Sequence, residues 1–230
     1  MTLTTRTVTG VDGCARGWIA VTLSSPDGRA GKIAGVRVTV AATLDRLPLA
    51  GVTGIDMPLG LVAAGWREAD LIAKRALGRR AATVFAIPPR PVLECLTYAE
   101  ANRACRDLTG KGLSVQAWGL RRKLAEADEY RRRAAVPLHE VHPELAFAAL
   151  AGGTAVPDSK HTKAGLATRR VLLENAGITL PPKVAGAAED DLLDAAAVAW
   201  SARRIASGDA VVLTSAAQCA DDGTEIAIRY

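Results

Sequence analysis

The most constraining feature of the sequence is a short, largely β-branched run that ends on a carboxylate. Residues 7–11 have the composition of a buried strand, and Asp12 follows at once, with Gly13 after it. A polar turn at residues 13–17 leads into a second apolar run at residues 18–23, so the pair predicts a hairpin. An unpaired carboxylate at the end of a buried strand lowers stability, which makes Asp12 the first candidate for a functional site.

The same pattern returns once along the chain. Residues 52–56 read Val-Thr-Gly-Ile-Asp, so a further strand delivers Asp56 at its end. Before it, a turn at residues 25–28 precedes an alternating run at residues 33–40, which is typical of an edge strand, and residues 41–47 form a short helical candidate. Three consecutive strands joined by short turns predict antiparallel pairing.

The middle of the chain is helical and basic. We interpret residues 58–136 as an insertion within a single domain that spans residues 1–230. Helices are expected at residues 66–77, 97–108 and 114–133, and Thr97 with Glu100 forms a capping box for the second of them. Three prolines keep residues 83–91 extended. The arginine-rich helix at residues 114–133 is most simply a solvated face.

The sheet is expected to resume at residues 138–142, followed by a helix that opens with Glu144. Further helices are predicted at residues 164–175 and 187–206, and a final strand or hairpin within residues 210–230. The helix at residues 187–206 carries several acids in its first turns, where acids suit the helix dipole.

Composition excludes several classes of protein. The 230 residues contain no apolar run long enough to span a bilayer, and the N-terminus lacks the hydrophobic core of a signal peptide, so we expect a cytoplasmic protein without a membrane contact. The four cysteines and three histidines show no zinc-ligand spacing, which predicts free thiols. A net charge of +5 permits a nucleic-acid partner without demanding one.

The carboxylates suggest a metal site. Asp12 and Asp56 end two strands, and Asp191 and Asp194 are three residues apart, so they share one face of the last long helix. Carboxylates that converge repel one another unless cations neutralise them, and oxygen ligands without thiolates select Mg²⁺ or Mn²⁺. Simpler interpretations stay open, because Asp12 and Asp56 also suit ordinary turns. In the same way Glu144 suits a helix start.

At this point the sequence resembles a known family. The similarity extends from about residue 8 to residue 200 and rests on six ordered motifs: Gly10-Val11-Asp12-Gly13-Cys14 with Gly17-Trp18, Ile55-Asp56-Met57-Pro58-Leu59-Gly60, Gly78-Arg79-Arg80 with Val84-Phe85 and Pro88-Pro89-Arg90, Leu113-Ser114-Val115-Gln116-Ala117-Trp118, Glu140-Val141-His142-Pro143-Glu144, and Asp190-Asp191 with Asp194-Ala195. These motifs are similar to those of the DUF429 family, which is catalogued as a domain of unknown function and described as a predicted RNase H-like nuclease.

The resemblance implies an α/β protein of RNase H-like fold. Its five-stranded mixed sheet would have three antiparallel strands, then two strands parallel to the first, flanked by helices and with the helical insertion between strands four and five. In such nucleases the metal ligands occupy the positions that correspond here to Asp12, Asp56, Asp191 and Asp194. His142 and Glu144 would lie beside the same cleft as further catalytic residues. No glutamate stands in the short helix after the third strand, where Asp45 is the only acid, so a resolvase-like arrangement is the closer comparison.

These expectations lead to a metal-dependent nuclease that hydrolyses phosphodiester bonds in DNA or RNA. Asp12 would bridge two Mg²⁺ or Mn²⁺ ions, and phosphates would be contacted by basic residues at five positions: Arg79, Arg80, Arg90, Lys160 and Lys163. Two alternatives remain, an ATP-handling protein on the same fold and a non-catalytic module that binds nucleic acid or protein. The oligomeric state stays open, with a homodimer as one option.

Overall fold

A single mixed sheet organises the molecule. The computed structural model describes residues 6–25, 33–134 and 136–230, and the predicted turn at residues 25–28 lies largely outside them. The strands are β1 (Arg6–Cys14), β2 (Gly17–Ser25), β3 (Gly35–Ala41), β4 (Val52–Ile55), β5 (Leu138–Val141), β6 (Val212–Cys219) and β7 (Glu225–Arg229). They lie side by side in the order β3-β2-β1-β4-β5-β7-β6.

The first five strands pair as predicted. β1, β2 and β3 are antiparallel, whereas β4 lies parallel to β1 and β5 lies parallel to β4. The predicted number of five strands is wrong, because the C-terminal hairpin adds β7 parallel to β5 and β6 antiparallel to β7, which makes seven strands. The tail was expected to contain a strand or hairpin, but nothing in its local sequence indicates which strand it joins.

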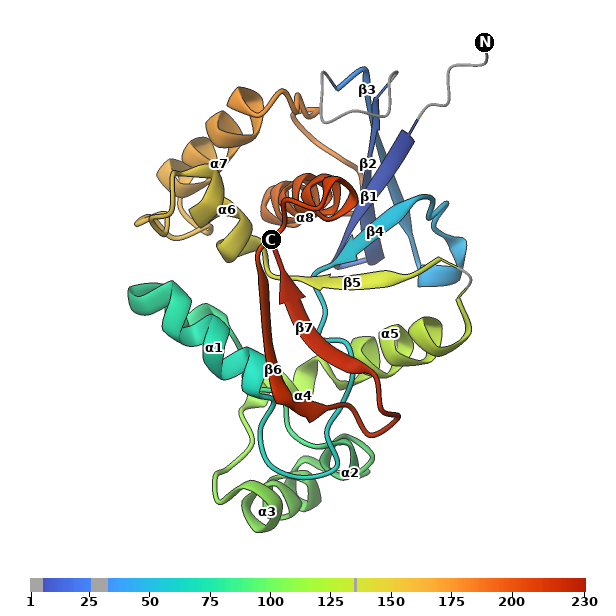
Figure 1. Cartoon of the computed structure of the whole chain (residues 1–230), viewed down its shortest axis with the longest axis vertical. Coiled ribbons are helices and arrows are strands. Elements are labelled where there is room, and N and C mark those ends of the chain that lie inside the picture. Colours follow the sequence, from blue (N-terminus) through green and yellow to red (C-terminus); the bar gives the residue numbers. More distant parts are fainter. Residues whose placement is uncertain (1–5, 26–32, 135) are drawn as a thin grey trace.

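Helices cover both faces of the sheet (Figure 1). They are η1 (Leu44–Arg46), α1 (Glu68–Leu77), η2 (Gly78–Thr83), α2 (Arg90–Leu93), α3 (Tyr98–Thr109), α4 (Val115–Gly119), α5 (Arg121–Arg133), α6 (Pro143–Leu150), α7 (Lys163–Asn175) and α8 (Glu189–Ser207). One face packs on α6, α7 and α8, and the other on α5 and η1. None of the helices in the described ranges combines the length and apolarity needed to cross a membrane.

The last helix lies directly on the central strands. A Cβ at Gly10 would stand only 2.0 Å from the backbone nitrogen of Ala199, so only glycine lets β1 approach α8 this closely. The alanines on that side of α8, including Ala195 and Ala199, are buried. This close packing holds α8 against β1 and β4 (Figure 1) and brings Asp194 of α8 close to the acids at the ends of both strands.

Residues 58–136 differ from their prediction in two places. The stretch at residues 83–91 was expected to be extended, but α2 begins at Arg90, because Pro91 falls in the first turn of a helix, where proline is tolerated. The expected helix at residues 114–133 is two helices, α4 and α5, which meet at Leu120. Gly119 ends α4, and glycine is among the weakest helix formers, so the break falls where propensity is lowest. The capping box of Thr97 and Glu100 is confirmed. All four cysteines are free.

Candidate active site

Three carboxylates meet at one edge of the sheet. Asp12 lies near the end of β1, and Asp56 directly follows β4, where its backbone N–H donates to the carbonyl of Val11 over 2.8 Å. Asp194 reaches them from α8. Each of these side chains offers an oxygen within 4.8 Å of the others. We call Asp12, Asp56 and Asp194 the acidic cluster; it forms because β1 and β4 are adjacent parallel strands and α8 crosses them.

The acidic cluster is poorly solvated. Asp12 and Asp194 are 8% and 1% exposed. Burial first, and then repulsion from Asp56, raise the pKa of Asp12, whereas burial and repulsion from Asp194 raise the pKa of Asp56 to about 8. Burial also raises the pKa of Asp194 against the effect of Lys160. Carboxylates this close together resist ionisation unless a cation neutralises them.

The two oxygens of Asp194 have different surroundings. Oδ2 accepts a hydrogen bond from Lys160 Nζ at 2.6 Å, whereas Oδ1 is buried without any hydrogen-bond partner. A buried carboxylate oxygen without a partner is costly, unless a ligand that the protein binds completes its coordination. Asp194 therefore has one oxygen that is free to bind a further group.

A cavity of about 550 Å³ opens over the acidic cluster. Its wall joins distant parts of the chain: Met57 and Pro58 after β4, Arg80 and Phe85 in the insertion, Leu120 and Lys123 at the start of α5, Glu140, His142 and Glu144 around β5, and Ser159, Lys160 and His161 before α7. Phe85 is 40% exposed. The cavity lining thus combines the acidic cluster with basic, acidic and apolar side chains.

His142 and Glu144 lie in this wall, as expected. Burial lowers the pKa of His142 to about 4, so the imidazole is neutral at pH 7, and its Nδ1 has no partner. Glu144 is buried, and its Oε1 accepts from Arg169 at 2.7 Å and from Arg80 at 3.4 Å. Glu144 is therefore already neutralised by two guanidinium groups.

Asp191 lies outside the acidic cluster. Its Oδ2 accepts the backbone N–H of Ala188 at 3.0 Å, which caps the start of α8. The sequence pattern could not distinguish this capping role from ligation, because both uses place an acid in the first turn of a helix. Asp191 still adds negative charge near Asp12.

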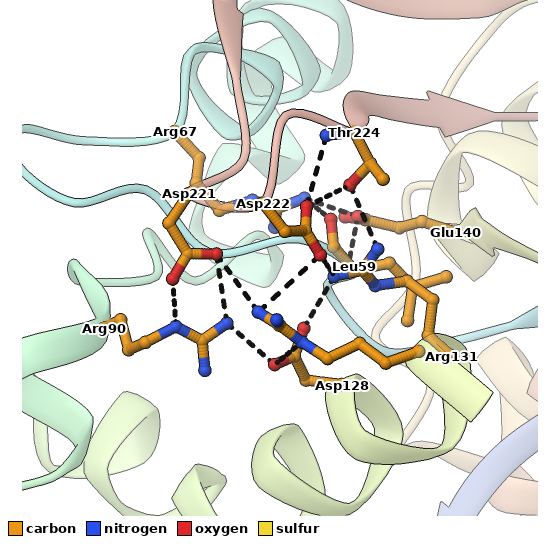
Figure 2. A network of polar contacts seen from close by, with 10 residues as sticks. Leu59, Arg67, Arg90, Asp128, Arg131, Glu140, Asp221, Asp222 and Thr224 are labelled. Atoms are coloured by element: carbon orange, nitrogen blue, oxygen red, sulfur yellow. Dashed lines mark hydrogen bonds and ion pairs between the residues drawn. The ribbon is translucent and has the colours of Figure 1, made fainter.

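The predicted phosphate contacts separate into two groups. Lys160 and Arg80 line the cavity. Arg79 and Lys163 are exposed and do not line it, and Arg90 does not line it either. Figure 2 shows Arg90 between Asp128 and Asp221 in a network that ties the turn before β7 to α2 and α5. The position of Arg90 therefore does not support the expected phosphate contact.

Sequence reasoning missed Lys123. Its ammonium donates to the carbonyl of Gly17 and stands 4.4 Å from the centre of the Trp18 ring. A Cβ at Gly13 would lie 3.1 Å from Lys123 carbons, so this glycine makes room for the lysine beside Asp12. The sequence pattern places Lys123 among the solvated charges of a basic helix. Only the packing of α5 on β2 brings it to the cavity.

A buried ion network that reaches the cavity lining was missed as well. Arg67 is fully buried; it donates to Glu140 and, over 2.9 Å, to Asp70. Glu140 also accepts the backbone N–H of Leu59 at 2.7 Å (Figure 2). Glu140 thereby fixes the segment that follows Asp56. The motif at residues 140–144 contained this glutamate, but its spacing gave no indication of a partner so far along the chain.

A model of the family described as "Protein of unknown function (DUF429)" matches residues 10–218. The chain belongs to this family. Among solved structures, this DUF429 protein is similar to one described as "Thermus thermophilus RuvC structure", with 16% identity, a TM-score of 0.35, and coverage of 88% of this chain and 97% of that chain. No curated protein matches it in sequence. Because this structural similarity is low, the function of the DUF429 site is inferred from the geometry of the site itself.

The raised pKa of Asp56 predicts a stability effect. Asp56→Asn should stabilise the metal-free protein, because a neutral amide avoids the repulsion within the acidic cluster. The pKa of Asp56 is higher in the folded state than its unfolded value of 3.8, so Asp56 contributes its full stabilisation to the wild type below pH 3.8. This stabilisation is lost as the pH rises through about 8. The advantage of Asp56→Asn should therefore grow between those pH values, to about 1–2 kcal/mol in the free energy of unfolding.

Urea unfolding of both proteins in the presence of a chelator, at several pH values, measures this difference. Taking the difference removes the contribution of His142, which titrates in the opposite sense. A variant less stable than the wild type at pH 8 would show that the acidic cluster is not under electrostatic strain.

Proposed function

We propose that this protein is a metal-dependent nuclease, which hydrolyses phosphodiester bonds in nucleic acid with Mg²⁺ or Mn²⁺ held by the acidic cluster. The observation that carries the proposal is the meeting of three carboxylates within 4.8 Å in the lining of a cavity. The order of β1 to β5 supports an RNase H-like core, since three antiparallel strands are followed by two parallel ones.

The donors fit a hard divalent cation. The acidic cluster supplies carboxylate oxygens only, and Asp194 Oδ1 is buried and unpaired. Oxygen ligands without thiolate or imidazole favour Mg²⁺ or Mn²⁺ over zinc. Neutralisation by such an ion would relieve the raised pKa values of Asp12 and Asp56.

The protein's own residues have separate roles in this proposal. Asp12, Asp56 and Asp194 hold the ion, which when bound activates water and stabilises the charge that develops on the phosphate. Lys123 attracts the phosphate from the wall formed by α5. His142, neutral at pH 7, and Glu144, fixed by Arg169, shape the same wall and offer hydrogen-bond acceptors.

The cavity also favours a nucleic-acid substrate of limited bulk. The acidic cluster lines the cavity, so a phosphate that binds there would lie within the cavity. Phe85 is exposed on the wall, where it could stack on a base of an unpaired nucleotide. Arg79 and Lys163 are exposed outside the cavity lining, where they could contact the rest of a strand. The net charge of +5 favours approach of a polyanion.

A cleavage screen tests the proposed function. Single-stranded, duplex, hybrid and branched DNA and RNA are incubated with Mn²⁺, with Mg²⁺ or with chelator. We expect cleavage of at least one substrate with either ion and none with chelator, and faster cleavage of substrates that have unpaired nucleotides. Cleavage that persists in chelator would exclude the metal-dependent mechanism. A protein that binds these substrates without cutting any would instead fit the non-catalytic module.

A further inference from the structure

Lys160 is part of the acidic cluster's charge balance. Its Nζ lies 2.6 Å from Asp194 Oδ2, and the lysine side chain is 32% exposed while that of Asp194 is 2% exposed. Lys160 also lines the same cavity as Asp12 and Asp56. Its ammonium therefore lies beside the acidic cluster.

The loop that carries Lys160 is held in place from several sides. The carbonyl of Ser159 accepts the Thr162 hydroxyl at 2.8 Å and the Thr162 backbone N–H at 3.0 Å. The carbonyl of Asp158 accepts from Arg169 at 3.0 Å, and Arg169 is fully buried and bound to Glu144. A Cβ at Gly165 would lie 2.0 Å from the Ser159 carbonyl oxygen, so the loop packs tightly on the start of α7. Lys160 is thus presented by a fixed backbone.

The neighbouring charges are balanced without Lys160. Glu144 is paired with Arg169 and Arg80. The negative charge of Asp191 near Asp12 is offset by the ammonium of Lys123, which lies beside Gly13. Once an ion is bound and the acidic cluster is ionised, what remains is its three negative charges and the one positive charge of Lys160. A single divalent ion on the free side of Asp194 would make this group neutral, whereas two ions would leave it with excess positive charge.

We propose that the acidic cluster binds one divalent ion and that Lys160 occupies the place of a second cation. This inference rests on the proposed function and replaces the expectation of two ions bridged by Asp12. Lys160 holds Oδ2 of Asp194, which leaves Oδ1 for the ion. In this arrangement the Lys160 ammonium balances the remaining negative charge of the acidic cluster. It also lies beside the position where a phosphate would bind to the ion.

Counting bound ions tests the inference without relying on activity. Isothermal titration with Mn²⁺ and native mass spectrometry are applied to the folded wild type, to Asp12→Asn and to Lys160→Met. We expect one Mn²⁺ per wild-type chain and loss of this ion in Asp12→Asn. Lys160→Met removes the charge and keeps the length of the side chain, so Mn²⁺ should bind at least about 10-fold more tightly or a second ion should enter.

Lys183→Met is the matched control, because Lys183 is an exposed lysine that does not line the cavity. It should bind one Mn²⁺ with wild-type affinity, as should Lys160→Arg, which keeps the charge. Two Asp12-dependent ions in the wild type, or unchanged number and affinity in Lys160→Met, would overturn the role of Lys160 while leaving the nuclease proposal intact. No bound ion in the wild type would overturn the proposed function itself.

Discussion

Asp12→Asn is expected to lower metal-dependent cleavage by at least about 1,000-fold. The substitution keeps the shape of the side chain and removes the charge that Asp12 contributes to the acidic cluster on β1. Metal ions supply several kcal/mol of transition-state stabilisation, and each 1.4 kcal/mol is about a factor of ten in rate. Asp194→Asn should have a similar effect, since it removes the carboxylate that α8 contributes. Initial rates on the best substrate of the cleavage screen measure both losses.

Asp107→Asn provides the control. Asp107 is exposed on α3, which lies away from α8, β1 and β4 (Figure 1). The cleavage rate of Asp107→Asn should therefore equal that of the wild type. Circular dichroism and thermal melting establish that each variant is folded before rates are compared. A folded Asp12→Asn protein that retains more than a tenth of the wild-type rate would place the metal chemistry elsewhere.

Arg67→Met should be the most destabilising single substitution in the buried ion network. Arg67 is fully buried and is the shared partner of Glu140 and Asp70. Its removal leaves two buried carboxylates without their cation, and breaking a buried pair in this way costs about 3–5 kcal/mol in the free energy of unfolding. For a chain of this length, each kcal/mol lowers the melting temperature by about 2–4 °C. Thermal and urea unfolding measure the loss.

Two further variants separate the ion network from a general effect of losing an arginine. Arg103→Met changes an exposed arginine of α3 and should leave the melting temperature unchanged within error. Adding Glu140→Gln to Arg67→Met should recover part of the lost stability, because the buried charge is then removed as well. If Arg67→Met melts like the wild type, the network does not stabilise the fold and Glu140 cannot be said to fix the segment after Asp56.

The meeting of Asp12, Asp56 and Asp194 was predictable because it depends on rules of topology. Two strands that each end on a carboxylate deliver those acids to one sheet edge if they are parallel neighbours, as β1 and β4 are. Small residues, Gly10 and the alanines of α8, indicate where a helix approaches such strands closely. Local pattern and family resemblance therefore gave the acidic cluster and the order of the first five strands.

What escaped prediction depends on contacts between distant segments. Asp191 has the same local sequence whether it caps α8 or binds a metal, and only the hydrogen bond from Ala188 distinguishes the two. The pairing of β7 with β5 and the approach of Lys123 to Gly13 join residues that are far apart in the chain. Neither leaves a periodic signal, so the place of the C-terminal hairpin in the sheet and the basic side of the cavity required the structure.

A crystal of the protein soaked in Mn²⁺ and measured for anomalous scattering tests the central claim most directly. We predict one anomalous peak per chain, within coordination distance of carboxylate oxygens from Asp12, Asp56 and Asp194, with Lys160 still bound to the other oxygen of Asp194. Acids that stay without an ion at saturating Mn²⁺, or an ion bound only at other carboxylates, would contradict a metal centre at this edge of the sheet.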